Sequence, residues 1–215
     1  MSDVDLAKSE RAAICDLLDQ LGPEQPTLCD GWTTRDLTAH LVVREARPDA
    51  SAGILVKPLE FWTEKVQNDA AKKPFAQLVE QVRSGPPKLS FFALPGIDAM
   101  ANSMEYLIHH EDVRRGQADW TPRDLDDDTR AEVWKRLSSS RRMLFRNSSV
   151  PVALDPTDVA DGAQHPVPAP PHGVVLRGPV VELALHAHGR SAVVGVEVDG
   201  SDEALAKYEE TRLGF

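Results

Sequence analysis

The stretch IDAMANSMEYLIHHEDVRRG, residues 97–116, predicts a long helix with two distinct longitudinal lines of side chains. Its apolar stripe consists of Ile97, Ala101, Met104, Leu107 and Ile108. Glu105, His109 and Asp112 follow at i, i+4 and i+7, so they form a second line along the edge of that stripe. His110 falls outside both lines and is expected to point to solvent.

The spacing of Glu105 and His109 is suited to binding a cation. Residues four apart on a helix have Cβ atoms about 5–6 Å apart, and carboxylate and imidazole are both zinc ligands. His40 is the best third candidate, because it lies on the shoulder of the apolar face of another predicted helix and facing helices commonly build metal sites. Three protein ligands leave a position open for water or substrate. The spacing leaves one alternative: a surface Glu–His pair, with His40 a core histidine.

The rest of the chain predicts a mainly α fold. Apolar stripes and start signals predict helices near residues 4–21, 33–46, 56–68 and 75–82, and from 126 onward. After about Ser149, Val-rich segments at 151–156, 173–178 and 192–200 predict short strands, with helices at 179–190 and 202–212. We therefore expect a helical domain over residues 1–150 and a small α+β domain over residues 151–215.

Composition and charge exclude several classes of protein. The net charge of −10 argues against a nucleic-acid partner, because an acidic surface repels phosphate backbones. No apolar stretch reaches the roughly 18 residues of a membrane span, and the charged start has no apolar signal region. Two cysteines do not make a disulfide framework. These features predict a cytoplasmic globular protein.

Two segments carry a resemblance to a known family. TLCDGWTTRDLTAHLVVREARPDA (27–50) and MEYLIHHEDVRRG (104–116) resemble the characteristic regions of an actinobacterial branch of the mycothiol-dependent maleylpyruvate isomerase-like proteins, within the wider DinB-like or YfiT-like superfamily. The similarity covers roughly residues 5–150. It implies a DinB-like four-helix bundle with a small α+β C-terminal appendage, and a metal between the helices. His40, in the D-L-x-x-H pattern, and the pair Glu105 and His109 match the family's ligand positions.

The resemblance also implies a chemistry. Family members include isomerases and S-transferases that use mycothiol, so we expect a divalent metal, zinc first and nickel as the alternative, that activates a bound thiol or water. The partners implied are a small-molecule thiol and an electrophilic substrate, acting on a monomer or homodimer. The alternative is a non-catalytic protein that binds a metal, a thiol or another small ligand. Arg177 and Arg190 are candidate substrate contacts in the C-terminal part.

Further side chains are candidates for supporting roles. Asp112 is placed to accept the second N–H of a ligating imidazole, with a surface acid as the alternative. Arg44 is either a partner for a substrate carboxylate or a salt-bridging helix residue. Glu45 and Glu111 are expected to face solvent. Cys29 is either a redox thiol or a small buried residue.

Overall fold

The computed structural model describes residues 5–47, 60–87, 90, 97–160 and 167–214. Within them the chain forms eight helices and a three-stranded sheet, which confirms a mainly helical fold with a small α+β C-terminal part. The described residues divide into two compact units, and the boundary along the chain lies between Thr121 and Pro122. Each unit is described by itself below.

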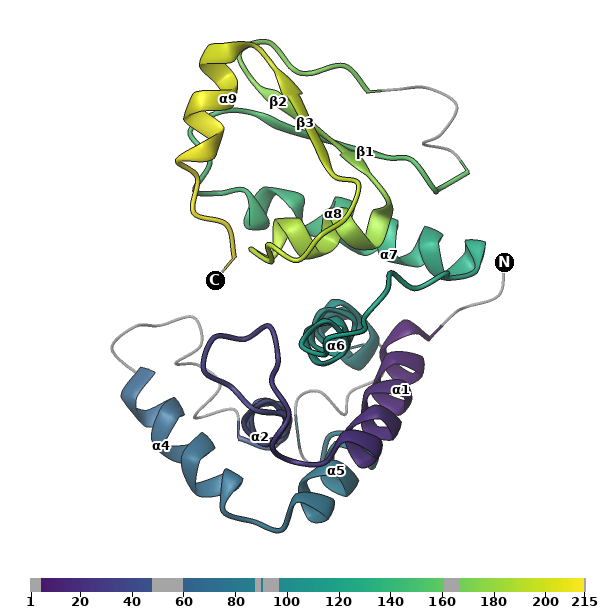
Figure 1. The fold of residues 1–215 in the computed structure, drawn as a ribbon, viewed down its shortest axis with the longest axis vertical. Helices are drawn as coiled ribbons and strands as arrows, with labels where there is room; N and C mark the ends of the chain where they lie inside the picture. The colour runs from purple at the N-terminus through teal and green to yellow at the C-terminus, as the bar shows by residue number, and fades with distance from the viewer. Residues whose placement is uncertain (1–4, 48–59, 88–89, 91–96, 161–166, 215) are drawn as a thin grey trace. The chain divides into compact units, whose positions relative to one another are not determined.

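The first unit is a helical bundle (Figure 1). Its helices are α1 (Leu6–Leu21), α2 (Thr34–Ala46), α4 (Glu60–Ala71), α5 (Phe75–Arg83) and α6 (Ile97–Arg115). Helix α1 packs along α6 and also contacts α5, while α2 packs against α4 and α5. Helix α4 replaces the helix predicted at 56–68, of which residues 56–59 lie outside the described residues.

The interior of the bundle is built from apolar side chains that its helices turn toward one another. Its fully buried members include Ile14 and Leu18 of α1, Leu37 of α2, Leu78 of α5 and Val113 of α6. Burying side chains of this size contributes about 1.5–3 kcal/mol each. Close packing of α1, α2 and α5 around these residues fixes the rotation of each helix about its axis, and with it the direction of the polar residues.

A capping box begins α2. The Thr33 side chain accepts a hydrogen bond from the Asp36 backbone N–H, and the Thr33 backbone N–H donates to Asp36 Oδ2 at 2.9 Å. Two N–H groups that the helix leaves without partners are thereby satisfied. The capping box thus marks the start of the helix predicted near residues 33–46, which carries His40.

The second unit combines helices with a small sheet. Its elements are α7 (Asp127–Leu144), β1 (Val152–Pro156), β2 (Val174–Gly178), α8 (Val180–Ala187), β3 (Glu197–Gly200) and α9 (Asp202–Glu209). The strand order is β1-β2-β3, with β1 parallel and β3 antiparallel to β2. Pro179 precedes α8, where its fixed φ suits the start of a helix. Strand β3 is shorter than the strand predicted at 192–200.

Helix α7 belongs to the second unit, where it packs on α8. The domain boundary that the sequence suggests at residue 150 stays a prediction. Among the described residues, no helix combines the length and the apolar character that a membrane span requires.

Candidate metal centre

His40 of α2 and the pair Glu105 and His109 of α6 converge on one point. The Nε2 atoms of His40 and His109 lie 3.2 and 3.3 Å from the same Oε1 of Glu105. The two imidazole centroids are 5.2 Å apart and their planes meet at 70°. Ligand atoms about 2.0–2.2 Å from one tetrahedral zinc ion lie about 3.3 Å from each other. The donor set and its spacings therefore fit a divalent cation.

Burial of the three side chains is uneven. The imidazoles of His40 and His109 are 10% and 11% exposed, whereas the Glu105 side chain is 24% exposed. The histidines are held by the interior of the bundle, and the carboxylate lies where solvent or a small ligand can reach it. A site of this kind keeps one side open.

The charges of the three groups depend on one another. Burial lowers the pKa of His40, an effect that its hydrogen bond to Glu105 only partly offsets. Burial also opposes charge on His109, but hydrogen bonds to Asp112, Cys29 and Glu105 outweigh it and raise the pKa of that imidazole well above its usual value. The pKa of Glu105 lies well below its usual value, because hydrogen bonds from His109 and His40 outweigh the desolvation that raises it.

Arg44 lies beside the carboxylate rather than apart from it. Its Nε is 3.1 Å from Glu105 Oε1, and its Nη1 donates a hydrogen bond to Asn102 Oδ1. The structure therefore shows the salt-bridging role that the sequence allowed for Arg44. Asn102 extends the contact inward, since its Nδ2 donates to Glu45 Oε1 at 2.8 Å.

The prediction that Glu45 and Glu111 face solvent is wrong. Both are buried, with 4% and 0% exposed. Glu45 accepts hydrogen bonds from Arg11, Asn102 and Tyr106, and these contacts place its carboxylate inside the bundle. Glu111 forms ion pairs with Arg114 and Arg115 at 2.9 and 2.6 Å. Both acids are buried because each has cationic partners in the interior.

The prediction for His110 is also wrong. It is 6% exposed, and its Nδ1 lies 2.8 Å from Oε2 of Glu10, a buried residue of α1. The apolar stripe on α6 predicts one buried face. In the structure α1 packs along α6, and α2 also contacts α6 through the polar side chains of His40 and Glu105. His110 lies on the α1 side and takes no part in the candidate metal centre.

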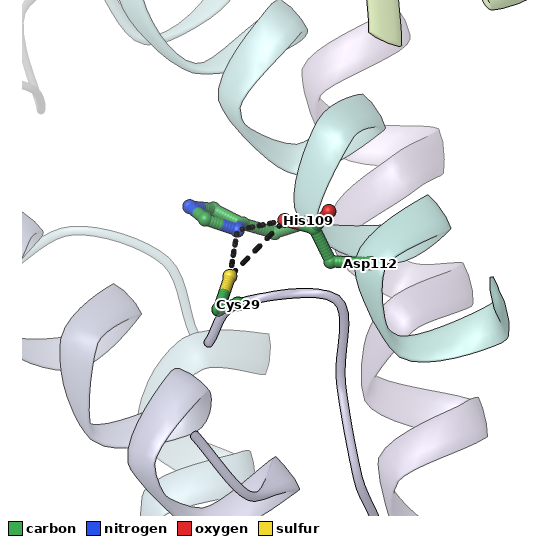
Figure 2. Close-up of side chains that lie close together, drawn as sticks. All are labelled: Cys29, His109 and Asp112. Atoms are coloured by element: carbon green, nitrogen blue, oxygen red, sulfur yellow. Dashed lines mark hydrogen bonds and ion pairs between the residues drawn. The ribbon is translucent and has the colours of Figure 1, made fainter. Parts of the chain in front are cut away.

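A second group of side chains lies behind His109 (Figure 2). Asp112 is fully buried, and its Oδ2 lies 2.9 Å from His109 Nδ1 and 3.3 Å from Cys29 Sγ. Cys29 Sγ is also 3.9 Å from His109 Nδ1. The surface alternative for Asp112 is thereby excluded, and Cys29 is half-buried rather than enclosed. Trp32 stands against the other imidazole, with its ring 5.1 Å from that of His40.

The two arginines of the second unit have local partners. Arg177 of β2 forms an ion pair with the buried Asp155 of β1. Arg190 Nη1 donates to the carbonyl of His188 at 2.8 Å. A contact of either arginine with a substrate stays a prediction.

Comparison with known proteins finds a family similarity in the first part of the chain. Residues 4–90 match the mycothiol maleylpyruvate isomerase N-terminal domain. This segment of the chain is therefore similar to the N-terminal domain of that family. The match includes Cys29 and His40 and ends before α6, so the placement of Glu105 and His109 rests on the geometry above. No curated protein and no solved structure matches the chain.

Sequence patterns missed part of the centre's surroundings. The i, i+4 spacing indicated Glu105 and His109, and the D-L-x-x-H pattern of the family indicated His40. Cys29 lies in the loop before α2, where no periodicity shows which way a side chain points. The sequence offered this residue as a redox thiol or a small buried residue, and it gave no sign of the contact with Asp112.

Proposed function

We propose that His40, Glu105 and His109 bind a divalent metal ion, with zinc the first choice and nickel the alternative. One observation carries the proposal: two imidazole nitrogens from different helices lie 3.2 and 3.3 Å from one carboxylate oxygen. Two imidazoles and a carboxylate form a donor set that both ions accept. Three protein ligands leave a position for a further molecule, which favours a catalytic or ligand-binding role over a structural one.

We further propose that the protein uses this ion to activate a thiol, which is mycothiol by analogy with the family. The activated thiol is either transferred to a small electrophile or assists its isomerisation. A divalent cation at this position lowers the pKa of a coordinated thiol or water. Arg44 supports this role, because its guanidinium lies 3.1 Å from Glu105 Oε1 and places a positive charge beside this ligand. An anionic group on the incoming molecule would find a partner there.

Metal content of the purified protein tests the ligand set. The variants His40→Ala and Glu105→Ala should keep their circular dichroism and lose the bound ion. His172→Ala, which removes an exposed histidine, is the matched control and should keep full occupancy. Full occupancy in both ligand variants would refute the proposed site.

The activity requires a separate assay. The metal-loaded protein is incubated with mycothiol and a panel of small electrophiles, and both the consumption of the thiol and the conversion of the electrophile are measured. Turnover that disappears in His40→Ala would support the thiol chemistry. Binding of metal without turnover across the panel would favour the alternative, a protein that binds a metal or thiol without catalysis.

A further inference from the structure

The imidazole of His109 has a different partner on each nitrogen. Its Nε2 faces Glu105 Oε1 at 3.3 Å, and its Nδ1 faces Asp112 Oδ2 at 2.9 Å. A neutral imidazole carries one N–H and one lone pair. When Nδ1–H donates to Asp112, the lone pair lies on Nε2, which faces the candidate metal centre formed with His40 and Glu105. Asp112 therefore determines which nitrogen of His109 is available to a cation.

Cys29 contacts the same carboxylate oxygen. Figure 2 shows the thiol reaching toward both His109 and Asp112 from the loop that precedes α2. Its Sγ–H donates to Asp112 Oδ2 at 3.3 Å, so Oδ2 accepts from the thiol and from the imidazole together. Asp112 is fully buried, and a buried carboxylate is held in one orientation by the donors that surround it. The thiol is thus part of what aims Asp112 at His109.

The position of Cys29 is set by its backbone. The neighbouring Leu28 N–H donates to the Asp112 carbonyl at 3.0 Å, and Gln117 Nε2 donates to the Pro26 carbonyl at 3.1 Å. Within the loop, the Cys29 N–H donates to Thr27 Oγ1 at 3.2 Å. These bonds fasten the loop to the C-terminal turns of α6 independently of the thiol.

The same loop reaches the second imidazole. Thr27 Oγ1 donates to the Trp32 carbonyl at 2.9 Å, and the Trp32 ring lies 5.1 Å from the His40 ring at a tilt of 47°. One short segment, residues 26–32, therefore contacts His40 through an aromatic ring and His109 through Asp112 and a thiol.

We propose that the loop of residues 26–32 positions both imidazoles, and that the Cys29 thiol raises cation affinity by holding Asp112 against His109. This inference rests on the proposed metal site. Cys29 acts here as a positioning residue and does not ligate the ion. Its Sγ, with His109 Nδ1 and Asp112 Oδ2, also forms a group of potential ligands within 4.8 Å of one another.

The two groups of potential ligands compete for His109. A neutral imidazole offers one lone pair, so a cation held by Nδ1 with Cys29 would turn Nε2 into an N–H donor. His40 and Glu105 would then lose their third partner. The observed Nδ1 to Oδ2 distance of 2.9 Å is that of a hydrogen bond, which favours the arrangement with the lone pair on Nε2.

The test measures Zn²⁺ affinity of the full chain by competition with a chromophoric chelator, in the wild type and in Cys29→Ala, Cys29→Ser and Cys15→Ala. Loss of the thiol donor in Cys29→Ala should weaken Zn²⁺ binding about tenfold. This is the lower end of the range seen when a hydrogen-bond partner of a metal ligand is removed. Cys29→Ser retains an O–H donor and should restore most of the affinity. Cys15→Ala removes a buried thiol of α1 and should bind as the wild type does.

Cobalt(II) substitution separates positioning from ligation. The wild type loaded with Co²⁺ should lack a thiolate-to-metal charge-transfer band. An affinity of Cys29→Ala equal to that of the wild type would overturn the inference, and so would a thiolate band that disappears in Cys29→Ser. Failure of the metal site itself is distinguishable, because the wild type would then bind no ion, or His40→Ala would bind it equally well.

Discussion

Arg11 Nη2 of α1 lies 2.6 Å from Glu45 Oε1 of α2, and both side chains are buried in the bundle. The same oxygen accepts hydrogen bonds from Asn102 Nδ2 and Tyr106 Oη, each at 2.8 Å. Glu45 therefore ties α1, α2 and α6 together one turn beyond His40. Helices α2 and α6, which carry the candidate metal ligands, therefore share this buried carboxylate with α1.

Replacing Glu45 by alanine should destabilise the protein by about 3–5 kcal/mol, because the Arg11 guanidinium would stay buried without its carboxylate. Urea denaturation followed by circular dichroism measures the change in free energy of unfolding. The matched control is Glu64→Ala, which removes an exposed glutamate of α4 and should change stability by less than about 0.5 kcal/mol. Equal effects of the two variants would mean that Glu45 is solvated.

Metal affinity should rise with pH. In the metal-free protein, hydrogen bonds to Asp112, Cys29 and Glu105 outweigh burial and raise the pKa of His109 well above its usual value. A cation needs the neutral imidazole, so binding displaces a proton and strengthens as the pH increases toward that pKa. Calorimetric titrations from about pH 6 to about pH 8, in buffers of different ionisation enthalpy, measure affinity and proton release. A pH-independent affinity without proton release would contradict the expectation.

The two cysteines should differ in reactivity. Burial raises the pKa of Cys15 to about 12 and leaves its side chain no exposed surface, whereas Cys29 is half-buried. Because the thiolate is the reactive form, an alkylating reagent should modify Cys29 first in the native protein. Both cysteines should react in denaturant, and peptide mass spectrometry identifies the sites. Native modification of Cys15 at the rate of Cys29 would be inconsistent with its enclosed position.

Gly116 allows the loop to approach α6. A Cβ at this position would lie 2.4 Å from the Pro26 carbonyl oxygen, so Gly116→Ala forces the loop away. We expect a destabilisation of about 1–3 kcal/mol together with weaker zinc binding. Thermal unfolding and chelator competition measure the two effects. Ala118→Ser, a change at a nearby exposed residue, should alter neither property. If Gly116→Ala is destabilised but binds zinc as the wild type does, the position of the loop does not affect the metal site.

The sequence was informative where side chains repeat along a helix. The start of α2 at its capping box and the alignment of Glu105 with His109 both follow from local spacing. Glu45 and His110 are buried, although an apolar stripe on one face of a helix predicts that the opposite face is solvated. Helices α2 and α6 bury polar residues as well, among them Thr38 and Ser103, and only the packing of other helices around them decides which polar groups lie inside.

Cys29 illustrates a second limit of prediction from the sequence. The direction of a loop side chain depends on long-range bonds such as that from Leu28 to Asp112, which no local pattern encodes. The partner of the thiol is 83 residues further along the chain. Such pairs emerge only when the helices are assembled.

The capping box of Thr33 and Asp36 determines the direction in which the His40 side chain points. It fixes the residue at which α2 begins, and each residue advances an α-helix by about 100°. Inserting or deleting a single residue between Asp36 and His40 would swing the imidazole away from α6 while leaving the helix intact. In homologous chains, length variation should therefore be tolerated outside this short interval and be selected against within it.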